Sequence, residues 1–375
     1  MKFKKLFALA VAGIMTMSFT ACGNNSQSAD SDTFKIGGIG PLTGDAANYG
    51  NSVKNGCQVA VDEINAAGGA NGKKLELLFE DDVNDAEKSV NAYNTLMDQG
   101  VQAIVGSVTS SPCIAVAAES ANDGILQITP SGSAKECTAG SNAFRICFTD
   151  PLQGEVMAKY IKDKGINKIA MIYDVSNDYS KGIHDSFAAK FTELGGQLVD
   201  DESFSKGDID FKTQLTKVKT SGAEALFLPI YYTEVGYISQ QAATLGLNIP
   251  YGCDGWDGII KQLNGDTKNI EGATYLTPFV ATDTSEKVQA FVNTYKEKYN
   301  AEPDQFAADG YDAVYAIKAA IEKAGDDTSN EALVSAMTQI SVNGLTGDMT
   351  FDENGEPNKS AKVVVIKDGQ YVAQN

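Results

Sequence analysis

Short apolar runs alternate with amphipathic stretches along most of the chain. Such runs predict buried strands, and the intervening segments repeat apolar residues at the three- and four-residue spacing of helices. In the first 150 residues, strands are expected at 34–39, 75–79, 101–105 and 125–129, and helices at about 51–68, 87–99 and from 112 onward. Strands that alternate with helices in this way are typical of an α/β fold with doubly wound sheets.

The alternation starts again after residue 150. Helices are expected at 153–164, 180–194, 211–220 and 234–245, and strands at 168–173, 197–203, 225–230, 250–253 and 272–276. Three helices then follow almost directly (285–299, 307–324 and 330–338), before a turn-rich hairpin at 347–355 and a last strand at 361–367. We expect the three helices to cover the first lobe, since they are followed by a return to strand.

The order of elements, with no long linker, predicts two Rossmann-like lobes joined by several crossings, with a cleft between them. The expected boundaries are 34–150 plus 279–344 for lobe 1, and 151–278 plus 345–375 for lobe 2. A chain of 375 residues is long enough for two such domains.

The N-terminus carries the features of an export signal. Lys2, Lys4 and Lys5 precede the apolar run 6–17, which is too short to span a bilayer. The small residues before Cys22 resemble a bacterial lipobox, and this predicts a signal peptide at 1–21 and a lipid on Cys22. Residues 22–33 would form a flexible tether. The alternative is an ordinary signal peptide with a chance cysteine. Either way, the protein is expected outside the cytoplasm, anchored to the outer face of the cytoplasmic membrane or in the periplasm.

Charge and cysteine content exclude several classes of partner. The formal net charge is −19, from 49 acidic and 30 basic residues, and no basic run follows residue 5. Nucleic acid is therefore not an expected partner. Five cysteines follow Cys22, none at metal-binding spacing, so we expect no metal. Cys137 and Cys147 could close a short disulfide loop or remain buried thiols, and the sequence leaves both open.

Motifs for catalysis or cofactor binding are weak. Gly38 and Gly40 follow a strand as in a dinucleotide fingerprint, but the third position of the motif is Thr43, so no cofactor is expected. There is one histidine, His184, and no zinc motif, nucleophile elbow or phosphate-binding loop. The chain is therefore not expected to be an enzyme, since Ser-His-Asp chemistry would depend on His184 alone.

The turn after the strand at 101–105 suits a small anion. The strand ends at Gly106. Ser110 and Ser111 stand where N-cap residues belong, ahead of a helix that we expect to begin at Pro112. A helix start presents unpaired N–H groups and a positive dipole end, which together favour a carboxylate.

Ligands of open α/β sheets bind beyond the carboxyl ends of the strands. Hydroxyls, aromatic rings and one acid occupy those ends here: Tyr49, Ser110, Ser111, Ser131, Ser133, Tyr179, Tyr231, Tyr232, Asp254 and Trp256. Together they suit a zwitterion, with its carboxylate on the Ser110 helix start and its ammonium on Asp254. Each also has a simpler explanation: Ser131 and Ser133 could only shape a turn, Tyr232 could pack outward, and Asp254 could cap a helix.

The chain resembles the bacterial solute-binding lipoproteins of the branched-chain amino acid type. The resemblance covers residues 34–367. Its motifs are Gly40-Pro-Leu-Thr-Gly-Asp45, Tyr49-Gly50, Ala60-Val-Asp-Glu-Ile-Asn-Ala-Ala-Gly-Gly69, Asn71-Gly-Lys73, Glu80-Asp-Asp82, the turn at 106–112, Ile128-Thr-Pro130, Phe144-Arg145 and Phe148-Thr-Asp150. The resemblance implies a type I periplasmic-binding fold, in which two lobes cross three times and close on an amino acid.

The resemblance also implies roles for individual residues. Three serines would hold the ligand carboxylate: Ser110, Ser131 and Ser133. Asp254 would hold the amine, Tyr179 and Tyr231 would meet its amine side, and Tyr49 would flank the side chain. A disulfide of some relatives does not carry over, because its positions fall near Asn84 and Thr109. Trp256 lies where the family varies, which leaves the side-chain preference open.

The expected function is therefore the extracytoplasmic binding component of an ABC importer. It would bind an amino acid, branched-chain or otherwise apolar, and deliver it to a membrane permease. The alternatives are a receptor of this fold for a short amide, urea or aromatic acid, a chemosensory lipoprotein, and, as the weakest, a secreted enzyme with His184 in its cleft.

Overall fold

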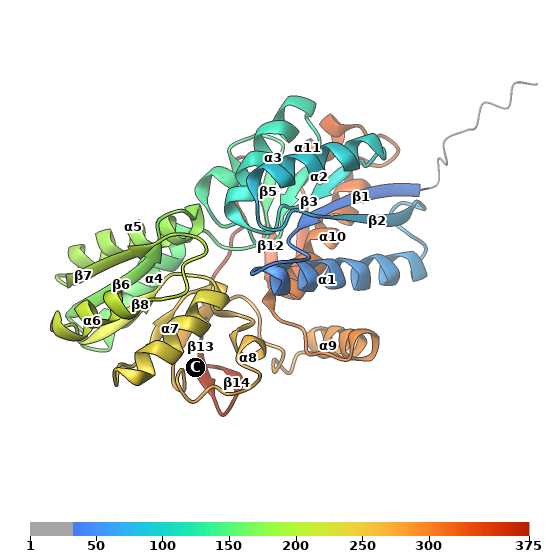
Figure 1. Cartoon of the computed structure of the whole chain (residues 1–375). Helices are drawn as coiled ribbons and strands as arrows, with labels where there is room; N and C mark the ends of the chain where they lie inside the picture. The colour runs from blue at the N-terminus through green and yellow to red at the C-terminus, as the bar shows by residue number, and fades with distance from the viewer. Residues whose placement is uncertain (1–32, 375) are drawn as a thin grey trace, which may run out of the picture. The chain divides into compact units, whose positions relative to one another are not determined.

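The computed structural model describes residues 33–374, and its first sheet is entirely parallel (Figure 1). Its strands are β1 (Thr33–Gly40), β2 (Lys74–Asp81), β3 (Ala103–Val105), β4 (Gln127–Thr129) and β5 (Ala143–Arg145). They lie in the order β2-β1-β3-β4-β5. This order is doubly wound, and it reverses between β1 and β3, where such folds bind their ligands.

Alternating side chains explain why helices cover both faces of this sheet. Neighbouring residues of a strand point to opposite faces. Phe34 and Ile36 of β1 join the core that includes Val53 of α1 (Ala47–Ala66). Ile39 points the other way, into a smaller core with Leu96 of α2 (Ala86–Asp98), which packs against α3 (Ser110–Asp123).

The second sheet repeats the strand order of the first. Its parallel strands are β6 (Lys168–Asp174), β7 (Gln197–Phe204), β8 (Ala225–Leu228), β9 (Tyr251–Gly252) and β10 (Thr274–Thr277), ordered β7-β6-β8-β9-β10. Antiparallel β13 (Lys362–Lys367) and β14 (Gln370–Ala373) extend it beyond β10. Its helices are α4 (Asp150–Asp163), α5 (Asp178–Glu193), α6 (Lys212–Thr220), α7 (Tyr232–Thr244) and the short α8 (Ile259–Gln262). The predicted α/β class is confirmed.

The C-terminal helices bring a third part of the chain to the first sheet. They are α9 (Glu286–Tyr299), α10 (Gln305–Ala324) and α11 (Asn330–Met337), followed by the hairpin of β11 (Ser341–Gly344) and β12 (Gly347–Thr350). α10 packs closely along α1. A Cβ at Gly56 would lie 1.9 Å from the carbonyl oxygen of Ala307, so only glycine permits this approach.

Several boundaries differ from those expected from the sequence. α1 begins at Ala47 and not near Asn51, and α3 begins at Ser110 and not at Pro112. The hairpin spans 341–350 instead of 347–355, and strand β14 was not expected. Short helices are added as η1 (Lys135–Thr138), η2 (Asp254–Trp256) and α8.

The predicted export features cannot be placed in this fold. The predicted signal peptide, Cys22 and all of the tether except residue 33 lie outside the described residues. Between residues 33 and 374, no helix combines the length and apolar character needed to cross a membrane.

Candidate functional site

The carboxyl ends of both sheets meet around a small enclosed cavity. Its space is about 220 Å³, of which only about 10 Å³ admits the centre of a water-sized sphere, roughly one water's worth. Five residues predicted for the site line it: Tyr49, Ser131, Tyr179, Tyr231 and Asp254. Four lining residues were not predicted: Val108, Thr109, Gly255 and Phe306. The cavity therefore has one wall from the first sheet and one from the second.

Asp254 is the acidic pole of the cavity. It begins η2 directly after β9 and is only 3% exposed. The hydroxyl of Tyr179 donates to its Oδ1 at 2.5 Å and accepts the N–H of Gly255 at 2.8 Å. Burial raises the pKa of Asp254 to about 6, although the hydroxyl of Tyr179 and the neighbouring side chain of Gln153 act in the opposite direction. A carboxylate in such a dry position favours a cationic partner.

Two buried glutamines hold the backbone of Asp254. The Oε1 of Gln153, on the first turn of α4, accepts the N–H of Asp254 at 3.1 Å. The Nε2 of Gln305, the first residue of α10, donates to the carbonyl oxygen of Asp254 at 2.7 Å. Sequence reasoning missed both glutamines, because their contacts join positions 101 and 51 residues apart. Both glutamines lie at helix starts near the expected crossings, and the sequence gives no other indication that they support the site.

An aromatic cluster closes the cavity beside Asp254. Tyr49 lies edge-on to Tyr231 and Tyr232, at 5.2 and 4.9 Å between ring centroids, and 4.3 Å from Phe306. Its buried hydroxyl donates to the carbonyl oxygen of Gly255, and burial raises its pKa well above the usual value. Tyr232 thus faces the site and does not pack outward. Tyr49 and Phe306 lie on α1 and α10, which pack together beside the first sheet, and Tyr231 and Tyr232 lie at the start of α7 beside the second, so the cluster joins the two walls.

The serine of the predicted anion turn acts differently from expected. The prediction that Ser110 and Ser111 cap the helix is wrong, because Thr109 is the N-cap, with an extended backbone and no side-chain cap bond. Ser110 is the first helical residue. Its Oγ accepts the backbone N–H groups of Ser133 and Ala134 at 3.2 and 3.1 Å. The Ser110 hydroxyl therefore ties α3 to the loop after β4.

The other serines occupy distinct positions around the turn. The Oγ of Ser131 donates to the carbonyl oxygen of Val108 at 2.7 Å. The Oγ of Ser133 is fully buried and has no hydrogen-bond partner within normal distance. Ser111 lines a neighbouring, wider cavity whose space is about 880 Å³, and its Oγ accepts the N–H of Asp178 at 3.4 Å. Ser110, Ser131 and Ser133 are thus brought together, whereas Ser111 faces the adjoining space.

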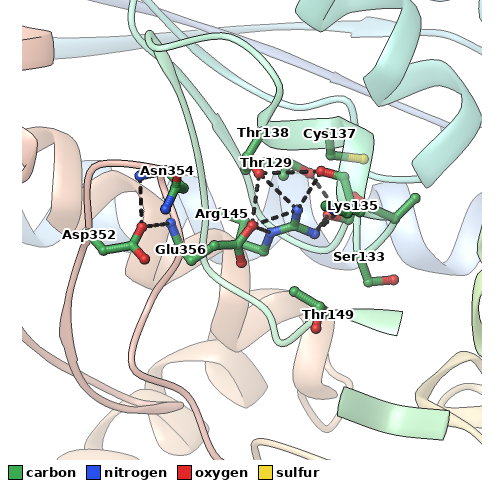
Figure 2. A network of polar contacts seen from close by, with 12 residues as sticks. Thr129, Ser133, Lys135, Cys137, Thr138, Arg145, Thr149, Asp352, Asn354 and Glu356 are labelled. Atoms are coloured by element: carbon green, nitrogen blue, oxygen red, sulfur yellow. Dashed lines mark hydrogen bonds and ion pairs between the residues drawn. The ribbon is translucent and has the colours of Figure 1, made fainter. Parts of the chain in front are cut away.

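Arg145 fixes the loop that carries Ser131 and Ser133 (Figure 2). Its side chain is fully buried, and all five of its N–H donors have partners. The acceptors are the carbonyl oxygens of Gly132, Ala134 and Lys135 and the side chains of Thr138 and Glu356, at 3.0–3.3 Å. In the sequence, Arg145 stands out only as part of the motif Phe144-Arg145. Its role in holding the loop could not be predicted, because the sequence does not show which carbonyl oxygens the guanidinium reaches.

Trp256 lies behind the wall rather than on the cavity. It is fully buried, and its indole N–H donates to the carbonyl oxygen of Leu228 at 3.0 Å. Its ring fills the space beside Gly252, where a Cβ would stand 2.2 Å from it. Here Trp256 supports the strand end that carries Asp254.

His184 is remote from the cavity lining. On α5, it stacks on Tyr173 at 3.9 Å, and its Nε2 lies 3.0 Å from Asp201. All five cysteines in the described part of the chain are free and buried, so the Cys137–Cys147 loop is not closed. Among residues 33–374, no group of His, Cys, Asp and Glu could hold a metal ion.

Comparisons with known proteins agree with this architecture. A family model described as "periplasmic binding protein" matches residues 33–370. The chain is 33% identical over 348 residues to a Leu/Ile/Val-binding protein homolog from Brucella melitensis, covering 92% of this chain and 93% of that one. Among solved structures, a leucine-binding protein from Thermotoga maritima is 33% identical with a TM-score of 0.85, covering 92% and 98% of the two chains. A branched-chain amino acid binding protein from Streptococcus pneumoniae, solved with isoleucine, is 31% identical with a TM-score of 0.84, covering 91% and 99%.

Proposed function

We propose a function from one premise: this chain belongs to the periplasmic binding protein family. It is the solute-binding component of an ABC importer and binds an apolar amino acid, such as leucine or isoleucine, between two lobes. Relatives at 31–33% identity that bind branched-chain amino acids by name support this assignment. The protein binds and releases its ligand without changing it.

The observation that carries the proposal is the polarity of the cavity. One wall presents Thr109, the N-cap of α3, and Ser131 to the cavity, with Ser110 and Ser133 bonded to each other behind them, and a helix start of this kind suits a carboxylate. The other presents Asp254, held by Tyr179. An amino acid carries the two matching charges on neighbouring atoms. The aromatic side chains between the walls, such as Phe306, suit an apolar side chain.

Ligand entry requires the two walls to separate. The open part of the cavity is smaller than any amino acid. Contacts across the walls would break on opening, among them the bond from Thr233 to the carbonyl oxygen of Asp45 at 2.7 Å and that from Lys206 to the carbonyl oxygen of Asn84 at 2.8 Å. We assign residues 34–150 plus 279–344 to one lobe and 151–278 plus 345–375 to the other, with three crossings as the hinge.

The site assignment has nine members, of which some contact the ligand and others support the walls. They are Tyr49, Ser110, Ser111, Ser131, Ser133, Tyr179, Tyr231, Asp254 and Trp256. Export by the signal at 1–21 and a lipid on Cys22 would hold the protein at the outer face of the membrane. There the closed form would dock onto a permease.

A thermal-shift screen against the twenty amino acids tests the proposal. A ligand that binds only the folded state raises the melting temperature. We expect one or more branched-chain amino acids to raise it, and Asp254→Ala to abolish the shift while the variant still unfolds cooperatively. Turnover of the ligand, or no shift with any amino acid, would contradict the proposal.

A further inference from the structure

Three buried side chains near Asp254 have polar atoms without a hydrogen-bond partner. Asp150 begins α4, where the chain crosses from the first sheet to the second, and neither of its carboxylate oxygens has a partner within normal distance. The Oγ of Ser133 and the Nε2 of Gln153 are in the same condition. All three residues are at most 1% exposed. Buried polar groups are nearly always hydrogen-bonded, so several unpartnered groups in one place indicate a missing polar partner.

Contacts on each side place Asp150 between the elements that build the site. Its backbone N–H donates to the carbonyl oxygen of Ser133 at 3.0 Å. A Cβ at Gly182, one turn after Tyr179 on α5, would lie 2.8 Å from its Oδ2. Gln153, one turn further along α4, holds the backbone of Asp254. Asp150 therefore adjoins both the first wall and the acidic pole.

Among residues 33–374, no side chain forms an ion pair or hydrogen bond with the Asp150 carboxyl group. Burial is the largest cause that raises its pKa well above the usual value, and Asp254 and Glu136 add to it. The nearby Ser133 hydroxyl, which lies beyond normal hydrogen-bond distance, and the charge of Arg145 act in the opposite direction. Arg145 has committed all five of its donors elsewhere. Asp150 in turn contributes to the raised pKa values of Tyr231 and Cys253.

We propose that Asp150 is a second carboxylate of the ligand site and binds the primary ammonium of an amino acid together with Asp254. The inference rests on the proposed function, because it requires an amino-acid ligand. An ammonium group has three N–H donors and no acceptor. Asp254, Asp150 and the Oγ of Ser133 would supply three acceptors. The cavity does not reach Asp150 here, so the walls must close less tightly on the ligand than they do in this structure.

Calorimetric titration with L-leucine tests the assignment on the full mature chain. Asp150→Asn keeps the shape of the side chain and removes its charge. We expect it to weaken leucine binding about 10- to 100-fold, as for the loss of a hydrogen bond to a charged group. Asp309→Asn is the matched control. Asp309 lies on α10, is buried like Asp150, and has one carboxylate oxygen without a hydrogen-bond partner. It should leave the affinity within about 2-fold.

Proton release separates a ligand contact from a structural role. Burial raises the pKa of Asp150, and an ammonium beside the carboxyl group would lower that pKa again, so wild type should release protons when it binds leucine near neutral pH. Titrations in phosphate and Tris buffers measure the number of protons released. Asp150→Asn should release close to none, and Asp309→Asn should match wild type.

Unchanged affinity, or weaker binding with undiminished proton release, overturns the role of Asp150 and leaves the proposed function standing. A wild-type protein that binds none of the twenty amino acids overturns both. If Asp150→Asn does not fold, Asp150→Ser provides the same comparison.

Discussion

The two walls of the cavity satisfy their polar groups in opposite ways. On the first wall, the hydroxyls of Ser110 and Ser131 already bond to backbone groups, and Arg145 holds the surrounding loop with five donors. On the second wall, Asp254 has a raised pKa, and the neighbouring Asp150 has no partner. Most of these polar groups of the first wall are bonded within the protein, with the Ser133 hydroxyl as an exception, whereas the buried carboxyl groups of Asp254 and Asp150 form no ion pair within residues 33–374.

This difference shows how the site can be both stable and specific. A wall fixed by internal hydrogen bonds presents its helix start in one geometry, which lowers the entropy lost on binding. A wall with uncompensated carboxylates disfavours the ligand-free closed form and favours a ligand that carries an ammonium. Variants of the first wall should therefore reduce stability, and variants of the second should reduce affinity while increasing stability.

The largest effect is expected from Arg145→Met on the first wall. Removing a buried guanidinium from its partners should lower the free energy of unfolding by about 3–5 kcal/mol. Chemical denaturation measures it. As a control, Lys217→Met removes an ion pair with Glu202 whose lysine is 57% exposed, and it should cost less than about 1 kcal/mol. Equal losses in the two variants would show that the first wall does not depend on Arg145.

A variant of the second wall should gain stability, and the size of the gain should depend on pH. The folded-state pKa of Asp254 is raised from 3.8 to about 6, so its contribution to stability is complete below pH 4 and is lost as the pH rises through 6. The loss amounts to about 3 kcal/mol at 1.36 kcal/mol per pH unit. Asp254→Asn should therefore gain stability relative to wild type between pH 4 and pH 8 in the absence of ligand. Denaturation at pH 4, 6 and 8 measures this gain, and a difference that does not change with pH would refute it.

Ser110→Ala should cause a smaller loss on the first wall. It leaves the N–H groups of Ser133 and Ala134 without their acceptor, at a cost of about 1–3 kcal/mol in unfolding free energy. Thr95→Ala, on an exposed face of α2, should stay within about 0.5 kcal/mol. If the two variants are equally stable, the tie between α3 and the loop after β4 contributes nothing.

Tyr49→Phe should have the smallest effect, because it removes one hydroxyl that joins the walls. The lost bond to the carbonyl oxygen of Gly255, together with the long contact of 3.3 Å from the N–H of Tyr232, should cost about 0.5–1.5 kcal/mol of unfolding free energy. The ring contacts with Phe306 and Tyr231 remain. A loss as large as that of Arg145→Met would mean that this bond, and not the first wall, dominates the stability of the site.

Much of the fold follows from local pattern. Strand β1 and helix α2 were predicted within two residues, because buried runs and amphipathic spacing are properties of neighbouring positions. The start of α1 was missed because Ala46 makes no side-chain cap and Tyr49 is held by residues about 180 positions later. The start of α3 was missed because the Ser110 hydroxyl bonds to another loop and not to its own helix.

The sequence predicted several residues that line the site, but not the hydrogen bonds that hold those residues in place. The strand-end rule placed Tyr49, Tyr179 and Asp254 at one cavity, since topology alone brings those ends together. The supports of Asp254, Gln153 and Gln305, depend on packing between distant segments, and no local pattern encodes them. Trp256 was assigned to the site on its type, but its ring fills the space beside Gly252.

Calorimetric titration of L-leucine into wild type and Asp254→Asn tests the central claim most directly. If the cavity binds an amino acid with its ammonium on Asp254, wild type should bind one leucine per chain. The variant should bind it at least about 30-fold more weakly, as expected when a buried charge loses its partner. Equal affinity of the two proteins for leucine would contradict the account.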